Sequence, residues 1–273
     1  MRGQGRPRIR GVQVLLVAVG CLVAACSTTG PSDVGRIDLT VFAAASLRDA
    51  TQAAIAVYAE AEPDVTITLS TDSSATLRTQ IEQGAPADVF LSADTDNPRR
   101  LVDLGMTEGT AVDFATNVPV IIVPAANPAR IGSPADLARP GVKMVAAGDE
   151  VPIARYAAEV VRALAALPGY PPGFASAVAA NVVSNEANVT AVLTKIELGE
   201  GDAGIVYRTD ARGSDAVVVV PIPSEVHVTA TYAGVVLLAS PEPREAAAFL
   251  DWLANGDGRS VLDRFGFLGP SPG

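Results

Sequence analysis

Hydrophobic residues recur along this chain with two alternating periods. Ile37, Leu39 and Val41 alternate with polar residues, as in a half-buried β-strand. From Leu47 to Ala61 the apolar positions instead recur every three or four residues, as on one face of an α-helix. Because this change from strand to helix periodicity repeats along the chain, it predicts an α/β protein with mostly parallel sheets.

The later part of the chain continues the alternation. Further strands are predicted at 65–69, 88–91, 117–124, 142–147, 182–183, 203–207, 217–220 and 232–238. Helices are predicted around 77–81 and 101–104, after Ser133, and at 153–167, 174–180, 189–198, 244–253 and 261–265. Proline cannot donate to a sheet, so Pro119 and Pro124 assign the strand at 117–124 to a sheet edge or a crossing. Long apolar stretches near 117–124 and 226–238 predict two lobes joined by crossing strands, with the ligand cleft between them.

The first 25 residues are predicted to be a secretory signal peptide. Four arginines lie among the first ten residues, and the apolar run at 12–25 is too short to span a bilayer comfortably. The small residues before Cys26 resemble a bacterial lipobox, which implies cleavage there and a lipid on the Cys26 sulfur. The protein would then be extracytoplasmic and anchored to the cell membrane; an ordinary signal peptide is the alternative. The predicted parts are the signal peptide 1–25, a flexible tether 26–35, the first lobe 36–117 plus 226–273, and the second lobe 118–225.

Charge and composition exclude several classes of function. The formal net charge is −10, and loss of a signal that carries four arginines and no acid would lower it to −14. A body this acidic is a poor ligand for nucleic acid or an anionic membrane. Cys21 would leave with the signal and Cys26 would be acylated, so no disulfide or cysteine zinc site is expected. His227, the single histidine, lies in an alternating stretch and is interpreted as a surface strand residue.

Four junctions between a strand and a helix stand out as candidate chemistry. They are Ser46–Leu47, 73–76, 151–154 and 188–189. Each would present free N–H groups at the positive end of a helix, where anions bind well, and two of them add serine hydroxyls. The ordinary interpretation is a helix cap; for Ser46 alone this is the more common case. Arg48 and Arg155 are the basic residues near these junctions, and the glycine pattern of a nucleotide-binding loop is absent from them.

Three segments resemble the molybdate-binding component of an ABC importer. They are VFAAASL at 41–47, QIEQGAPADVFLSAD at 80–94, and GIVY at 204–207. The middle motif is the most specific because it is long and unusual. The resemblance extends from about residue 37 to 267. It implies a class II periplasmic-binding-protein fold, in which two α/β lobes close on the ligand.

The resemblance also implies the site. Molybdate or tungstate would be held by the hydroxyls of serines and a tyrosine and by backbone N–H groups, with no counter-charge, no protein-ligated cation and no cofactor. Carried over by position, the ligand-binding residues are Ser46, Ser74, Ile153, Val189 and Tyr207. Asn188 stands where the family has aspartate, and Tyr207 could instead be an ordinary buried tyrosine. The expected partners are the oxyanion and a membrane permease, and the expected state is a monomer.

Other functions fit the sequence less well. A serine hydrolase would need His227 beside a serine and a Gly-x-Ser-x-Gly elbow, whereas Ser46 follows three alanines. A ferric-iron-binding protein would favour adjacent tyrosines and carboxylates, and Tyr207 has no tyrosine neighbour in the sequence. We therefore expect a binding protein and not an enzyme. A binding protein for another tetrahedral oxyanion, such as sulfate, is the remaining alternative.

Overall fold

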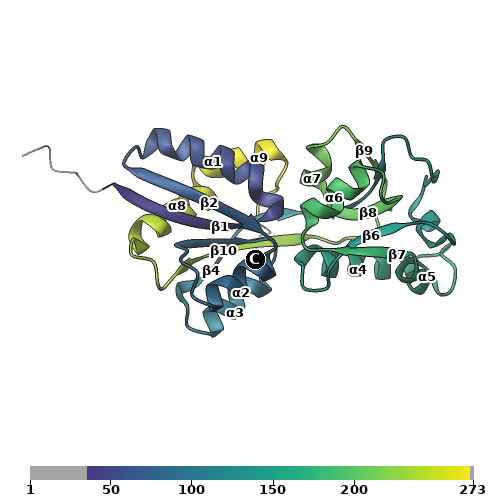
Figure 1. Cartoon of the computed structure of the whole chain (residues 1–273), viewed down its shortest axis with the longest axis horizontal. Coiled ribbons are helices and arrows are strands. Elements are labelled where there is room, and N and C mark those ends of the chain that lie inside the picture. Colours follow the sequence, from purple (N-terminus) through teal and green to yellow (C-terminus); the bar gives the residue numbers. More distant parts are fainter. Residues whose placement is uncertain (1–35, 271–273) are drawn as a thin grey trace, which may run out of the picture. The chain divides into compact units, whose positions relative to one another are not determined.

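Two five-stranded sheets form the framework of residues 36–270, the part of the chain that this computed structural model describes (Figure 1). The first sheet has the order β2-β1-β3-β10-β4, with β1 Ile37–Ala44, β2 Val65–Asp72, β3 Val89–Ser92, β4 Thr107–Asn117 and β10 Ala230–Leu237. The second has the order β7-β6-β8-β5-β9, with β5 Pro119–Pro124, β6 Met144–Ala147, β7 Val182–Glu186, β8 Ala203–Tyr207 and β9 Val217–Val220. The predicted signal peptide, Cys26 and the tether lie outside the described residues.

Helices cover both faces of each sheet (Figure 1). Around the first sheet lie α1 Arg48–Ala61, α2 Ser74–Glu82, α3 Asp96–Asp103, α8 Pro243–Asn255 and α9 Asp257–Phe265. Around the second lie α4 Pro152–Ala165, α5 Phe174–Ala180, α6 Val189–Glu197 and α7 Arg208–Arg212. Short 3₁₀ turns occupy Ala45–Leu47 and Pro134–Ala138. In the first sheet's layer, α1 and α9 lie opposite α2 and α3; in the second, α6 and α7 lie opposite α4 and α5.

In each sheet four strands run in one direction, in line with the prediction of mostly parallel sheets, and one strand runs against them. In the first sheet β1 runs parallel to β2 and β3, while β10 is antiparallel to β3 and β4. The second sheet repeats this division, with β6 parallel to β7 and β8 and β5 antiparallel to β8 and β9. The antiparallel strands are those that return from the other sheet. The α/β class is as predicted. The alternation of hydrophobic and polar residues did not indicate which strand of each sheet runs against the others.

The strand at 117–124 was predicted to lie at a sheet edge or at a crossing, and it spans the crossing residue Val118. β5 lies inside the second sheet, between β8 and β9, and not at an edge. Its prolines are tolerated because Pro119 is its first residue and Pro124 its last, so neither interrupts the ladder in the middle. The long strand β4 and the short helix α7 were not predicted, because β4 alternates weakly and α7 is only five residues long.

The chain crosses between the sheets twice. The first crossing is a single residue, Val118, between β4 and β5. The second is the irregular segment 221–229, where a strand was expected from 226. His227 is exposed as predicted, but it lies in this irregular segment and not in a strand. The described residues pack into one compact unit, so the predicted lobe boundaries stay a prediction.

The apolar interior is continuous beneath both sheets. Tyr58 of α1 packs against Phe249 and Trp252 of α8, with ring centroids 5.1 and 4.9 Å away, and so joins two helices far apart in sequence. A smaller cluster around Phe42, Phe90 and Leu101 lies between the first sheet and helices α2 and α3. In residues 36–270, the search for a helix both long and apolar enough to cross a bilayer finds none.

Close packing of α6 on β8 gives a stability prediction. A Cβ atom added at Gly204 would lie 2.9 Å from Val192 Cγ1 and 3.2 Å from the Val145 carbonyl oxygen. We expect Gly204→Ala to lower the free energy of unfolding by about 1–3 kcal/mol, as overpacking does in a dense core. Urea unfolding followed by circular dichroism measures it. Gly132→Ala is the control, since a Cβ there meets nothing within 4 Å; equal losses in both variants would contradict the packing argument.

Candidate functional site

Strand pairing brings the four predicted junctions into two neighbouring pairs. β1 and β2 run parallel with Ala44 opposite Asp72, so the turn that holds Ser46 lies beside the start of α2. β6 and β7 run parallel with Ala147 opposite Glu186, which sets the start of α4 beside the start of α6. Because carboxyl ends of parallel strands share one sheet edge, each sheet presents two helix starts at that edge.

A small cavity lies where these edges meet. Its lining is uncharged and consists of Ala44, Ala45, Ser46, Ser73, Ser74, Ala93, Val151, Pro152, Ile153, Asn188, Val189 and Tyr207. All five residues carried over from the resemblance are therefore brought together around one cavity. Its volume is about 10 Å³, which is room for about one water-sized sphere.

Ser46 contacts a hydrogen-bonded chain of two side chains, Tyr232 and Asn117. Helix α1 begins at Arg48 with Leu47 as its N-cap and no side-chain cap, so the capping interpretation of Ser46 is wrong. The Ser46 hydroxyl instead lies 3.0 Å from the Tyr232 hydroxyl, which accepts a 3.5 Å bond from Asn117 Nδ2. Either hydroxyl of this pair can donate to the other. In the arrangement where Tyr232 donates, the hydroxyl hydrogen of Ser46 is free to donate to a ligand.

Ser74 is held in a similar way, and it is not the cap of its helix. Ser73 caps α2, because its Oγ accepts a 3.2 Å bond from Thr76 N. Ser74 is the first helical residue, is 1% exposed, and accepts a 3.0 Å bond from Ala93 N. One lone pair of its oxygen is thus occupied by a backbone donor, and its O–H remains available to the cavity.

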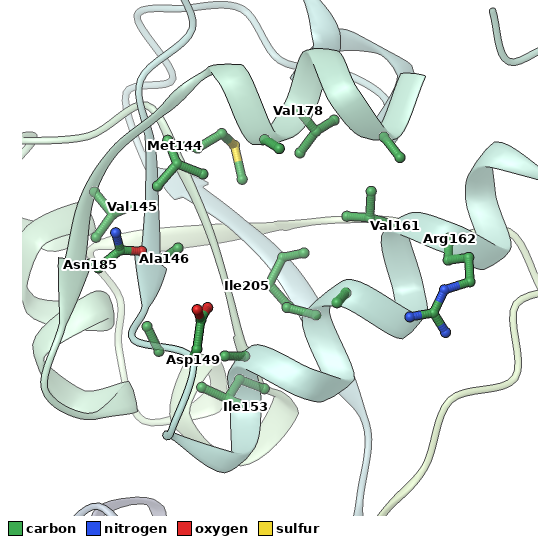
Figure 2. A pocket seen from close by; sticks show the side chains of 17 residues that line it. Met144, Val145, Ala146, Asp149, Ile153, Val161, Arg162, Val178, Asn185 and Ile205 are labelled. Carbon is green, nitrogen blue, oxygen red and sulfur yellow. The ribbon is translucent and has the colours of Figure 1, made fainter. Parts of the chain in front are cut away.

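Ile153 and Val189 contribute backbone groups. They are the second residue of α4 and the first of α6, where an N–H group has no intrahelical acceptor. The side chain of Ile153 also lines a separate pocket of about 400 Å³ between α4, α5 and the second sheet (Figure 2). That pocket is walled mainly by alanine, valine, isoleucine and methionine, so it offers an anion few donors. The side chain of residue 153 can therefore be apolar while its N–H faces the smaller cavity's edge.

Tyr207 supplies a hydroxyl with no partner among residues 36–270. The side chain is 1% exposed, and its ring packs edge-on against Tyr156 and Tyr232 with centroids 6.3 and 5.6 Å away. Burial raises the pKa of Tyr207 well above its ordinary value, so the hydroxyl stays protonated and able to donate. The alternative of a tyrosine satisfied by a backbone carbonyl does not hold here. A buried hydroxyl left unpaired costs about 1–3 kcal/mol.

Polar contacts tie the two sheets together around the cavity. Arg155 of α4 pairs with Asp96 of α3 at 3.3 Å, and Asn188 Nδ2 donates to Asp72 Oδ1 at 3.3 Å. The same Asn188 caps α6 through its Oδ1, which accepts from Ala191 N at 3.0 Å. An aspartate at 188 could also cap the helix, but it would face the Asp72 carboxylate. Asparagine at this position is therefore explained by its neighbour.

Sequence reasoning missed the residues that support the site. Tyr232 and Asn117 orient Ser46, and Ala93 N holds Ser74. Asp210 accepts a 3.0 Å bond from Tyr207 N and so fixes the peptide group of the tyrosine. Its position three residues after Tyr207 has the spacing of a capping box, which was the one signal available. Within the described residues, no group of three His, Cys, Asp or Glu is arranged to hold a metal ion.

A cavity of uncharged donors between two α/β sheets joined by two crossings defines a solute-binding protein. The model of the bacterial extracellular solute-binding protein family matches residues 39–268, and the chain belongs to this family. This confirms the prediction of an extracytoplasmic binding protein and not an enzyme.

Known proteins extend the comparison. The chain is 36% identical over 256 residues to the molybdate-binding protein ModA of Mycobacterium tuberculosis. The alignment covers 93% of each chain. A periplasmic molybdate-binding protein of Azotobacter vinelandii aligns with a TM-score of 0.70 and 20% identity, over 85% of this chain and 100% of that one. The sulfate-binding protein SubI of Mycobacterium tuberculosis aligns with a TM-score of 0.73 and 20% identity, over 86% and 88%. The two structures confirm the predicted periplasmic-binding-protein fold and, at this identity, the fold alone.

Asp210 gives a prediction about pH. The pKa of its carboxyl is raised to about 7, mainly by burial; the hydrogen bond from Tyr207 N lowers this pKa and the charge of Asp49 raises it. The folded state then holds the proton more tightly than the unfolded chain, whose aspartates have a pKa near ~3.9. Stability from this group is complete below about pH 4 and is lost as pH rises through about 7.

We therefore expect Asp210→Asn to remove that loss while it keeps an acceptor for Tyr207 N. The melting temperature of the variant relative to the native protein should rise between about pH 4 and about pH 8. Asp64→Asn, at an exposed carboxylate, is the control. A difference that stays constant with pH would count against a raised pKa at Asp210.

Proposed function

We propose that this chain captures molybdate, and tungstate as a tetrahedral dianion of the same form, outside the cytoplasm and delivers it to the permease of an ABC importer. The observation that carries the proposal is the buried, unpartnered hydroxyl of Tyr207 in an uncharged cavity lined by serines and helix starts. The relationship to molybdate-binding relatives over nearly the whole chain supports the choice of anion.

The chemistry of the donors favours a fully deprotonated anion. Molybdate at neutral pH offers only acceptors, and the five proposed groups are hydroxyl or N–H donors. Hydrogen phosphate must also donate, and a proton facing only donors would cost it about 1–3 kcal/mol. Sulfate has the same charge and shape, so only its smaller size separates it. Since the donors are neutral, helix-end dipoles and oriented hydroxyls supply the attraction.

The size of the cavity supports a site that opens and closes. Room for one water-sized sphere does not admit a five-atom oxyanion, so the two sheets must separate to receive it. Ser46 and Ser74 belong to the first sheet's layer and the other three residues to the second, so an anion bound by all five would hold the layers together. The crossings at Val118 and 221–229 are where the chain would bend. All donors come from one chain, which supports a monomer.

The N-terminal part completes the proposal. Residues 1–25 would direct export, Cys26 would carry a lipid, and residues 26–35 would tether the binding unit to the outer face of the cell membrane. The support is the basic start, the short apolar run and the small residues before the cysteine. A tether keeps the binding protein near its permease and raises the effective concentration.

Calorimetry tests the anion and the site together. Molybdate and tungstate should bind with similar affinity, sulfate more weakly and phosphate weakest. Ser46→Ala, Ser74→Ala and Tyr207→Phe should each weaken molybdate binding roughly ten- to a hundredfold, because each deletes one hydrogen bond to a charged ligand, worth about 1.5–3 kcal/mol.

The matched control is Arg155→Gln, which removes a nearby charge that does not line the cavity. It should change affinity at most a few-fold, in line with a partly exposed ion pair. A large loss at Arg155 with small losses at the serines would make the proposed donors ordinary helix-end residues. If the native protein binds sulfate more tightly than molybdate, the proposed ligand is wrong and sulfate takes its place.

The lipid anchor has its own test. Cys26→Ala should move the protein from the membrane fraction to the medium or wash, because the thiol that would carry the lipid is gone. Cell fractionation with an antibody to the protein measures this, and Ser27→Ala is the control that leaves the cysteine intact. Unchanged membrane association of Cys26→Ala would argue for an ordinary signal peptide.

A further inference from the structure

The cavity is flanked by two larger grooves that differ in charge. One groove of about 350 Å³ shares Ala45 and Ser46 with the cavity. The other, of about 240 Å³, shares Val151 and Pro152 with it. Both grooves are lined from both sheets' layers, so each lies beside the cavity along the join between the layers.

The first groove carries free cations. Three arginines line it, Arg48 of α1, Arg212 of α7 and Arg264 of α9, against two aspartates, Asp49 and Asp210. Among the described residues, none of the three arginines has a carboxylate oxygen within 4.0 Å; Arg48 donates instead to Thr71 Oγ1 at 3.1 Å. All three are exposed. We call this surface the arginine groove.

The second groove carries paired charge. Three arginines line it against four carboxylates, and each of these arginines is engaged in an ion pair. Arg78 and Arg100 both pair with Glu82, Arg100 at 3.1 Å, and Arg155 pairs with Asp96 at 3.3 Å. The formal balance of this acidic groove is therefore negative, and its positive charge is already neutralised.

A dianion approaching this protein meets a repulsive field, because the formal net charge is −10. The proposed site has no cation of its own to offset that field. The arginine groove has a positive formal balance, three arginines against two aspartates, and positive charge along a cleft raises the local concentration of anions and their association rate. We propose that the arginine groove is the mouth through which the oxyanion reaches Ser46, and that Arg48, Arg212 and Arg264 set the association rate without binding the anion in the closed site.

This inference rests on the proposed function and makes a claim about rates. A unit charge acting on a dianion at about 8 Å in water, with physiological salt, changes its local concentration roughly twofold. Replacing each arginine by glutamine should therefore slow molybdate association roughly twofold, and replacing all three should slow it roughly eightfold. The dissociation rate should not change. Lysine at the same positions keeps the charge and should keep the association rate.

Stopped-flow measurement of intrinsic fluorescence on mixing with molybdate provides both rates. The ionic strength should range from about 0.01 M to about 1 M, over which the Debye length falls from about 30 Å to about 3 Å. The difference between native protein and triple variant should be largest at low salt and vanish at high salt. Arg100→Gln, in the acidic groove, is the control and should slow association less than the variants in the arginine groove do.

The outcomes separate the two proposals. Native protein that binds no molybdate would overturn the proposed function and this inference with it. Native protein that binds molybdate, with an unchanged association rate in the triple variant, would overturn this inference alone. It would equally be overturned if the effect appeared in the dissociation rate, persisted at high salt, or were matched by Arg100→Gln.

Discussion

The arrangement of the site depends on one buried hydrogen-bond donor that has no acceptor among the residues that the structure describes. The Tyr207 hydroxyl is closed off from solvent, and Tyr207 lines a cavity whose other residues are uncharged. A folded protein tolerates such a group only where something else stabilises it, because an unpaired buried hydroxyl is costly. In this protein the unpaired hydroxyl lies at the cavity, where an acceptor atom of a bound ligand would remove the cost. The strands that end at this edge and the helices that begin there serve to gather donors.

The supporting bonds give the donors their direction. Asn117 bonds to Tyr232 on the first sheet and to Thr209 Oγ1, 2.8 Å away, on the second, and its Oδ1 accepts from Val118 N at 2.9 Å. It stands at the single-residue crossing between the sheets. The residue that would feel a bend of the chain at Val118 is thus also the residue that orients Ser46. A bend at Val118 would therefore act on the bonds that hold Tyr232 and, through it, Ser46.

Much of this was accessible from the sequence, for identifiable reasons. The strand at 203–207 and the strand at 217–220 were predicted to the residue, because each is a short apolar run with a charged residue or a proline close to its ends. The donors were found because they belong to local motifs that begin helices. Tyr232, Asn117 and Asp210 were missed because their roles depend on contacts between segments that lie far apart in the chain or across a turn. The prolines of β5 left both an edge and a crossing open, because a proline at a strand end is indistinguishable, in sequence, from one at an edge.

Two of the proposed donors, at 153 and 189, are peptide groups, and their side chains point into packing. Comparison of residue identities does not detect such a site, because isoleucine, alanine and valine all present the same N–H group. Substitution at these positions would be judged by how well the new side chain fills the interior, not by what it does to the anion. Proline is the exception, because it deletes the N–H while it leaves a helix start intact. Evolution can therefore change the side chains at two of the five proposed donor positions without altering the chemistry of the cavity.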